Sequence, residues 1–295
     1  MANSISLFKK YIDKLDEVYK QASLTADLDA DSTLVQAGAN ANEIIIPKMS
    51  MDGLGKYDRN SGYVQGDVTL TNETVQFNYE RGRKFGVDRM DNAETAGVAF
   101  GRLASEFTRT KAVPEGDAFT FAKIAGTSGI TTTTGTYANG EAWLTALVTA
   151  QTAMDNAEVP TESRILYITP EGLNSIQAVD TTKSREVLAS FTKIVKVPQT
   201  RFYTKITLND GTTSGQTAGG YVKANDGSDI NFLIVEKSAV IKYPRILVNK
   251  IVSPDDNQTD DKWLFFYRAY GLVDVYDNKV AGVYLSSKNG GASVE

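Results

Sequence analysis

Four aspartates gathered in one predicted turn are the side chains best placed to do chemistry in this sequence: Asp255, Asp256, Asp260 and Asp261. Clustered carboxylates can bind a divalent cation, and a pair of them can act as acid and base in a hydrolase. No further ligand spacing accompanies the four, and acidic runs in turns are usually solvated. We therefore expect no metal ligand and no catalytic residue here, with a carboxylate-dependent enzyme as an alternative.

A second acidic pattern alternates along the chain at Asp27, Asp29 and Asp31. A calcium loop of the EF-hand type needs Gly at its sixth position and Glu at its twelfth, whereas this segment has Ser32 and Gly38 there. The pattern therefore fails as a calcium site, and we expect a solvated, extended arm.

The composition excludes several classes of active site, because the 295 residues include no histidine and no cysteine. Without histidine there is no Ser-His triad and none of the commonest general base near neutral pH. Without cysteine there are no disulfides and no thiolate zinc sites. The formal net charge of -5 gives no electrostatic footprint for tight nucleic-acid binding. No apolar run approaches the roughly 20 residues of a membrane span, so we expect a globular protein without a cofactor, a membrane or an enzymatic activity.

Apolar residues recur at steps of three and four over residues 4–22, among them Phe8, Ile12 and Leu15. This spacing predicts an amphipathic helix at the N-terminus. We expect its apolar face to pack on its own subunit or on a neighbouring one.

The next predicted element along the chain is a long two-stranded excursion, that is, a β-hairpin that projects from the subunit. A β-prone run at Glu43 to Ile46 precedes a glycine-punctuated stretch and an alternating run at Val75, Phe77 and Tyr79. An isolated hairpin buries little and is marginal in water, so we expect this one to lie on another subunit, with a solvent-facing hairpin as the alternative. Basic residues in its loop and at its end are the candidate intersubunit contacts: Lys56, Arg59, Arg81, Arg83 and Lys84.

Helical spacing dominates residues 91–126, where Phe100, Leu103 and Phe107 share one face. Pro114 should kink or restart this helix. The element is therefore long enough to serve as the spine of a subunit.

The remaining chain mixes helices and strands. Asn139 should cap a helix, and Thr169 with Pro170 should begin another after a buried strand at Arg164 to Ile168. Two loops are predicted: a Thr/Gly-rich loop that follows residue 126 and a surface loop at 211–228. Further strands are predicted at 205–208, 231–236, 245–252, 263–276 and 280–285. This order indicates an α+β or α/β arrangement in the middle third, and we predict an α+β fold for the whole chain.

The sequence of residues 81–126 is RGRKFGVDRMDNAETAGVAFGRLASEFTRTKAVPEGDAFTFAKIAG. It resembles the stretch in which an extended loop leads into the spine helix in the major capsid proteins of tailed bacteriophages. These proteins form the HK-ninety-seven fold family. The order of predicted elements is similar to that family over essentially the whole chain. The resemblance implies a structural subunit that forms pentamers and hexamers, and these tile an icosahedral shell around double-stranded DNA.

The resemblance also divides the chain: an N-terminal arm at 1–46, an extended loop at 47–84, a peripheral domain from 85–126 and 240–286, an axial domain at 127–239, and a tail at 287–295. It implies a virion assembled in the host bacterial cytoplasm, with a separate scaffolding protein, a portal protein and a decoration protein as partners. Two alternatives stay open beside the enzyme. One is an encapsulin-like shell around a protein cargo, and the other is a phage tail or baseplate component.

Overall fold

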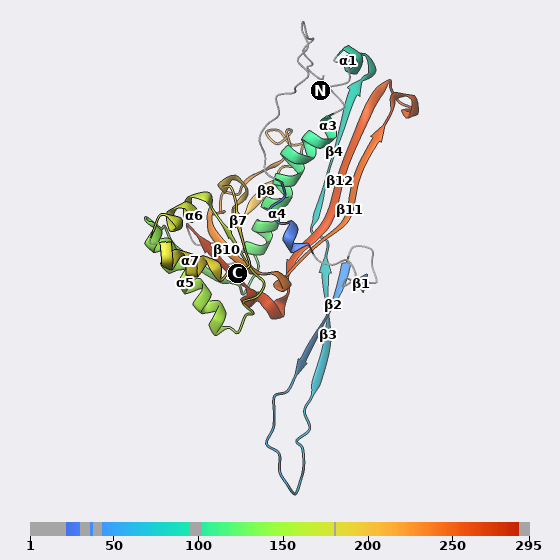
Figure 1. The fold of residues 1–295 in the computed structure, drawn as a ribbon. Coiled ribbons are helices and arrows are strands. Elements are labelled where there is room, and N and C mark those ends of the chain that lie inside the picture. Colours follow the sequence, from blue (N-terminus) through green and yellow to red (C-terminus); the bar gives the residue numbers. More distant parts are fainter. Residues whose placement is uncertain (1–21, 30–35, 38–42, 95–101, 180, 289–295) are drawn as a thin grey trace.

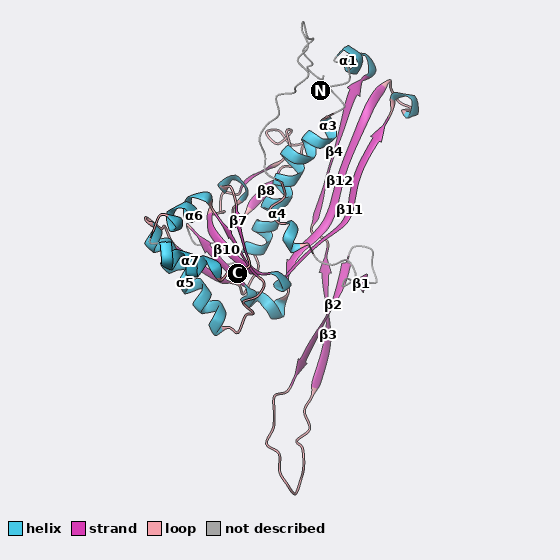
Figure 2. Cartoon of the chain, viewed as in Figure 1, coloured by secondary structure: helices cyan, strands magenta, loops and turns pink. Residues whose placement is uncertain are grey.

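The computed structural model describes residues 22–29, 36–37, 43–94, 102–179 and 181–288. Figure 1 shows a compact lobe of helices and strands beside a long sheet, with a hairpin projecting away from both. Figure 2 shows helices and strands in both of these parts, which agrees with the α+β prediction. The amphipathic helix predicted at 4–22 falls outside the described residues except for Ala22.

A five-stranded sheet forms the centre of the lobe, in the order β5-β13-β10-β6-β7. The central strand, β10, pairs antiparallel with β13 and β6, whereas β5 and β7 are parallel to their neighbours. All residues of β10 and β6 are buried, and both strands are predominantly apolar, as strands covered on both faces are. The strands are β5 (Thr131–Thr134), β6 (Arg164–Ile168), β7 (Lys193–Lys196), β10 (Ile230–Glu236) and β13 (Val283–Ser287).

Helices pack on this sheet, and their starts follow the local sequence. The Asn139 side chain accepts a hydrogen bond from the Ala142 N–H and begins α5 (Gly140–Asn156), as predicted. Thr169 likewise accepts from Gly172 and begins α6, with Pro170 in its first turn. These two helices and α7 bury Trp143 and Leu147 against the sheet. Their bounds are α6 (Pro170–Gln177) and α7 (Thr181–Ala189).

A second, three-stranded sheet runs alongside the lobe in the order β11-β12-β4. It consists of β4 (Tyr79–Asp88), β11 (Val240–Val252) and β12 (Lys262–Val275), all antiparallel. The spine helix lies along this sheet (Figure 1). Phe107 of the helix meets Phe85 at 4.8 Å between ring centroids and Phe265 at 6.2 Å, and these aromatic contacts hold helix and sheet together.

The spine helix is continuous from α3 (Leu103–Phe107) through a π-helical stretch at Thr108–Ala112 to α4 (Val113–Ala125). The short helix α1 (Arg89–Glu94) precedes it. Pro114 lies at the start of α4, directly after the π turn, so the interruption predicted for Pro114 is confirmed. Proline lacks an N–H and clashes with the carbonyl four residues earlier, and a π turn is one way in which a helix adapts to this defect.

The projecting hairpin pairs β2 (Glu43–Met51) with β3 (Val68–Gln76), and β1 (Gln36–Ala37) adds to β2. The register runs from Glu43 opposite Gln76 to Met51 opposite Val68. The predicted excursion is confirmed, but residues 79–84 belong to β4 of the long sheet and not to the hairpin. Their alternation continues because β4 also has one half-buried and one exposed face.

Three other segments differ from expectation. The Thr-rich stretch predicted as a loop forms β5, since β-branched residues suit a sheet edge. Within the predicted loop 211–228, β9 (Tyr221–Lys223) pairs with β8 (Ile206–Leu208). Strand β13, expected in the peripheral domain, hydrogen-bonds to β10 of the lobe. The domain boundaries themselves remain a prediction.

Candidate interaction surfaces

Among the described residues, only the base of the hairpin packs on the rest of the subunit. Ile44 and Val75 are 3% and 8% exposed, in a cluster with Ile241 of β11 and Leu272 of β12. Beyond this cluster the apolar side chains face solvent: Met49, Met51, Leu54, Tyr63, Val64, Val68 and Leu70. A contiguous run of exposed apolar side chains marks a surface that binds another protein. The hairpin therefore presents an apolar surface for which the described residues of its own chain offer no cover.

Ionic contacts fix the base of the hairpin. Lys48 of β2 forms ion pairs with Glu73 of β3 at 2.7 Å and with Asp277, which follows β12. The hydrogen bond from Lys48 to Asp277 raises the pKa of the lysine and lowers that of the aspartate, so both groups stay charged. The pair links β2 to the residue that follows Tyr276 at the end of the long sheet.

The tip of the hairpin has its own local order and carries two of the predicted contact residues. The carboxylate of Asp58 accepts hydrogen bonds from the backbone N–H groups of Asn60 at 2.7 Å and Ser61 at 3.1 Å, and these bonds lower the pKa of Asp58. Lys56 and Arg59 lie exposed beside this turn. Their role as intersubunit contacts remains a prediction that their exposure permits.

The structure places Arg81, Arg83 and Lys84 on β4, where each already contacts its own chain. Arg81 forms an ion pair with Glu115 at 2.5 Å and donates to the Asn209 carbonyl at 2.7 Å. Arg83 donates to the Thr217 carbonyl at 3.1 Å, and the Lys84 ammonium lies 5.4 Å from the ring centre of Phe266. Arg81 and Arg83 thus donate hydrogen bonds to backbone carbonyls of the loop between β8 and β9.

The sheet face that carries Lys84 is an open groove with basic edges. Phe266 forms part of its floor, and Lys84, Lys250 and Arg268 line it. Glu80 pairs with Arg268 at 2.5 Å, which neutralises one of these cations. This groove was not predicted from the sequence, because Lys250 is brought opposite Phe266 by the register of β11 on β12.

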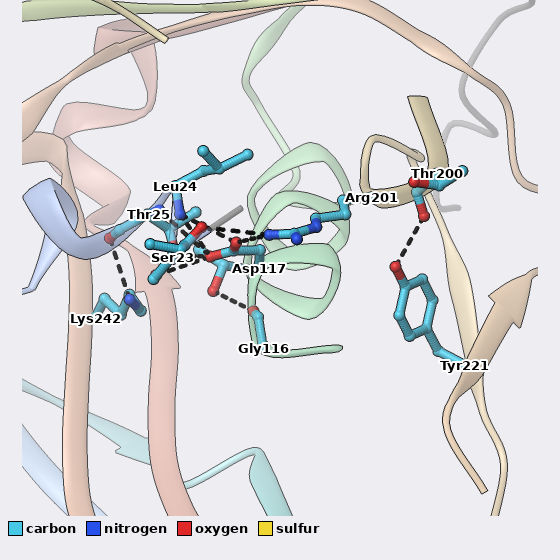
Figure 3. Close-up of polar contacts among 11 residues, drawn as sticks. Ser23, Leu24, Thr25, Gly116, Asp117, Thr200, Arg201, Tyr221 and Lys242 are labelled. Atoms are coloured by element: carbon cyan, nitrogen blue, oxygen red, sulfur yellow. Dashed lines mark hydrogen bonds and ion pairs between the residues drawn. The ribbon is translucent and has the colours of Figure 1, made fainter. Parts of the chain in front are cut away.

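A buried ion pair lies on the other side of the spine helix. Arg201 donates to the Asp117 carboxylate at 2.9 Å, and the two side chains are 3% and 1% exposed. Figure 3 shows the same carboxylate facing the chain near the N-terminus. It accepts from the Leu24 N–H at 3.0 Å and from the Thr25 hydroxyl at 2.8 Å. Asp117 belongs to the stretch whose sequence resembles the capsid family, but its pairing with Arg201 was not predicted, because the two residues are distant along the chain.

Carboxylates of the acidic turn at 254–261 form ion pairs with basic side chains of the same chain. Arg89 forms ion pairs with Asp255 and, at 3.2 Å, with Asp261. Lys262 pairs with Asp260 at 2.8 Å and lowers its pKa. Over the described ranges no group of three or more acidic residues could hold a metal ion. The turn thus has ionic partners that explain its charge.

Two further observations bear on the sequence predictions. Phe8, Ile12 and Leu15, the predicted contacts of the N-terminal helix, lie outside the described residues. None of the helices in the described part of the chain is long and apolar enough to cross a membrane.

Comparison with solved structures identifies the fold. The chain matches the capsid of the cyanophage P-SCSP1u with a TM-score of 0.62 at 14% identity, covering 95% of this chain and 92% of that chain. The mature capsid of bacteriophage PhiM1 gives a TM-score of 0.64 at 11% identity, covering 95% and 91%. A virus-like particle from Pyrococcus furiosus gives 0.51 at 12% identity, covering 83% and 86%. No protein-family model and no curated protein matches the sequence.

The two phage likenesses extend over nearly the whole of both chains. The fold predicted from the resemblance of residues 81–126 is therefore confirmed, with its hairpin, spine helix, long sheet and separate lobe. This chain has the fold of bacteriophage capsid proteins.

Proposed function

We propose that this protein is a major capsid subunit, whose copies assemble into a closed shell. One observation supports this most strongly: the hairpin extends from the subunit with its apolar side chains exposed. Such a surface is costly for a protein that works alone, and a copy of the same subunit is the simplest partner for it. The fold shared with phage capsids supports the same reading.

The finer features of the proposal rest on the family resemblance. Pentamers and hexamers would tile an icosahedral shell around double-stranded DNA in the virion, assembled in the host bacterial cytoplasm. A separate scaffolding protein, a portal protein and a decoration protein are the expected partners. The net charge of -5 suits a shell that encloses DNA without binding it tightly, since few phosphates would be neutralised.

A compartment shell around a protein cargo is the second candidate. The likeness to a virus-like particle from Pyrococcus furiosus shows that the fold also occurs in a particle described only as virus-like, so the contents of the particles have to be tested. The two functions differ in what the particles contain. Electron microscopy of particles purified from a host that also makes the neighbouring gene products separates them, because DNA-filled shells support the capsid and protein-filled shells the compartment.

The apolar surface of the hairpin can be tested directly. Leu54→Asp combined with Val64→Asp places two charges on side chains that are exposed in the subunit. We expect the urea midpoint of the subunit to stay unchanged and particle formation, followed by sedimentation, to be lost. Leu54→Met is the matched control, because it keeps an apolar side chain of similar volume and should still assemble. Normal particles from the double variant would remove the hairpin from the assembly interface.

A further inference from the structure

Residues 22–29, here called the strap, cross the junction between the lobe and the long sheet. Leu28 is 1% exposed and belongs to the main core of the lobe, beside residues of β6 and β10. Asp29 forms a parallel bridge to Lys242 of β11. The strap therefore contacts both sheets, although it belongs to neither of them.

Two partly exposed ion pairs hold the C-terminal half of the strap. Lys193 of β7 pairs with Asp27 at 2.5 Å, and the lysine side chain is 52% exposed. Lys242 pairs with Asp29 at 2.8 Å and also donates to the Thr25 carbonyl at 3.1 Å. Solvent-exposed pairs contribute little to stability, so they do not by themselves hold the strap in place.

The buried carboxylate of Asp117 holds the N-terminal half of the strap. It accepts from the Ser23 hydroxyl at 3.0 Å as well as from Leu24 and Thr25, at the start of the one-turn helix η1 (Ala26–Leu28). Hydrogen bonds to a buried charge are stronger than those between neutral groups. Figure 3 shows these donors converging on one side of Asp117 while Arg201 occupies the other.

Arg201 balances the charge of the Asp117 carboxylate at 2.9 Å. A carboxylate buried without a cation would be strongly disfavoured. Arg201 lies in the one-turn helix η4 (Gln199–Arg201), so it approaches from the lobe, and it also donates to the Ala22 carbonyl of the strap at 3.4 Å. The ion pair thus stays with the body of the subunit when the strap leaves it.

We infer that the strap is a releasable clamp whose lock is the Asp117–Arg201 pair. When locked, it ties α4 and the two sheets together and fixes the point at which the N-terminal residues meet the subunit. When released, it opens as a unit without unfolding the lobe. This property belongs to the single subunit and does not depend on its assembly into a shell.

Amide hydrogen exchange on the unassembled full-length chain tests the clamp. Thr25→Val removes the 2.8 Å hydroxyl donor and leaves the Asp117–Arg201 pair intact. We expect exchange at the amides of Leu24, Thr25 and Leu28 to become at least about tenfold faster, because a hydrogen bond to a charge is lost. Exchange in β10 should stay unchanged. Lys193→Ala is the control, and it should leave exchange at these three amides as in the wild type.

Asp117→Asn is the stronger variant, since it removes the charge that both Arg201 and the strap use. It should accelerate exchange in the strap more than Thr25→Val does. Unchanged exchange at Leu24 and Thr25 in the Thr25→Val variant would overturn the proposal. Equal acceleration in the strap and in β10 would overturn it too, since the strap would then be an ordinary part of the core. Both results are independent of whether wild-type subunits form particles.

Discussion

Glu115 and Asp117 lie in the first turns of α4 and hold different parts of the chain. Glu115 binds Arg81 of β4, and Asp117 binds Arg201 and the strap. Both carboxylates follow the π turn that precedes Pro114. This short stretch of the spine helix is therefore where the long sheet, the lobe and the N-terminal segment are joined.

Charge reversal at Arg81 should destabilise the subunit. In Arg81→Glu a second carboxylate would face Glu115, whose side chain is 11% exposed, and the Asn209 carbonyl would lose its donor. We expect a loss of roughly 3 kcal/mol in the free energy of unfolding, measured with urea. Arg81 is therefore unsuited to testing intersubunit contacts.

Arg83→Glu is the matched comparison on the same strand. Arg83 is exposed where it donates to Thr217, and its replacement should cost less than about 1 kcal/mol. If Arg83 contacts a neighbouring copy, this variant will fold and fail to form particles. Equal destabilisation by the two reversals would contradict the distinction between a partly buried ion pair and a surface one.

The hydroxyl of Tyr167 is buried and has no hydrogen-bond partner within the described part of the chain. Its ring packs edge-on against Phe121 at 5.1 Å in the core of the lobe. Because an unsatisfied buried hydroxyl is unfavourable, Tyr167→Phe should raise the free energy of unfolding by about 1 kcal/mol.

Tyr137→Phe is the control for that experiment. The Tyr137 hydroxyl lies 2.8 Å from the Ser286 hydroxyl, so its removal should lower the stability by about 1 kcal/mol. A loss of stability in Tyr167→Phe as well would show that the Tyr167 hydroxyl has a favourable partner after all.

Two glycines should respond in opposite directions to substitution by alanine. Gly211 has φ +78°, where an alanine is strained, and its new Cβ would lie 2.7 Å from the mobile end of Arg83. Gly116 lies within α4 and has nothing within 4 Å of the added Cβ. Thermal unfolding should show Gly211→Ala destabilised by roughly 1 kcal/mol and Gly116→Ala stabilised by about 0.5 to 1 kcal/mol. The same sign for both would contradict these backbone assignments.

Stability should fall at alkaline pH because of buried tyrosines. Burial raises the pKa of Tyr79 and Tyr167 well above the ordinary value, and that of Tyr221 to about 12. The folded state then keeps protons that the unfolded state releases above about pH 10, so this contribution is complete below pH 10 and is lost as the pH rises. For Tyr221 the loss extends to about pH 12.

Urea midpoints at pH 9 and pH 11 measure this effect, with tyrosinate absorbance recorded in the folded state. We expect a lower midpoint at pH 11 and incomplete ionisation until unfolding. Full ionisation of all tyrosines in the folded protein at pH 11 would contradict the burial of these hydroxyls.

Local sequence signals predicted the elements that depend on neighbouring residues. Asn139 and Thr169 begin helices because each cap needs only the next three residues, and the interruption at Pro114 follows from its missing N–H. The hairpin was predicted from apolar alternation. Its end was not, since the alternation continues into β4.

Contacts that join distant segments were not predictable from patterns of this kind. Asp117 and Thr25 are 92 positions apart, and Arg201 is a further 84 positions beyond Asp117. Arg81 was chosen as an intersubunit contact because it is a charged residue near a hairpin, but Glu115 binds it once the spine helix packs on the long sheet. Such pairings follow from the fold and not from local spacing.

Cryo-electron microscopy of the purified wild-type protein tests the central proposal most directly. We expect closed particles of regular size in which the hairpin, including Leu54 and Tyr63, is covered by a neighbouring copy of the chain. A protein that remains monomeric or dimeric under all assembly conditions, with the hairpin still exposed, would contradict it.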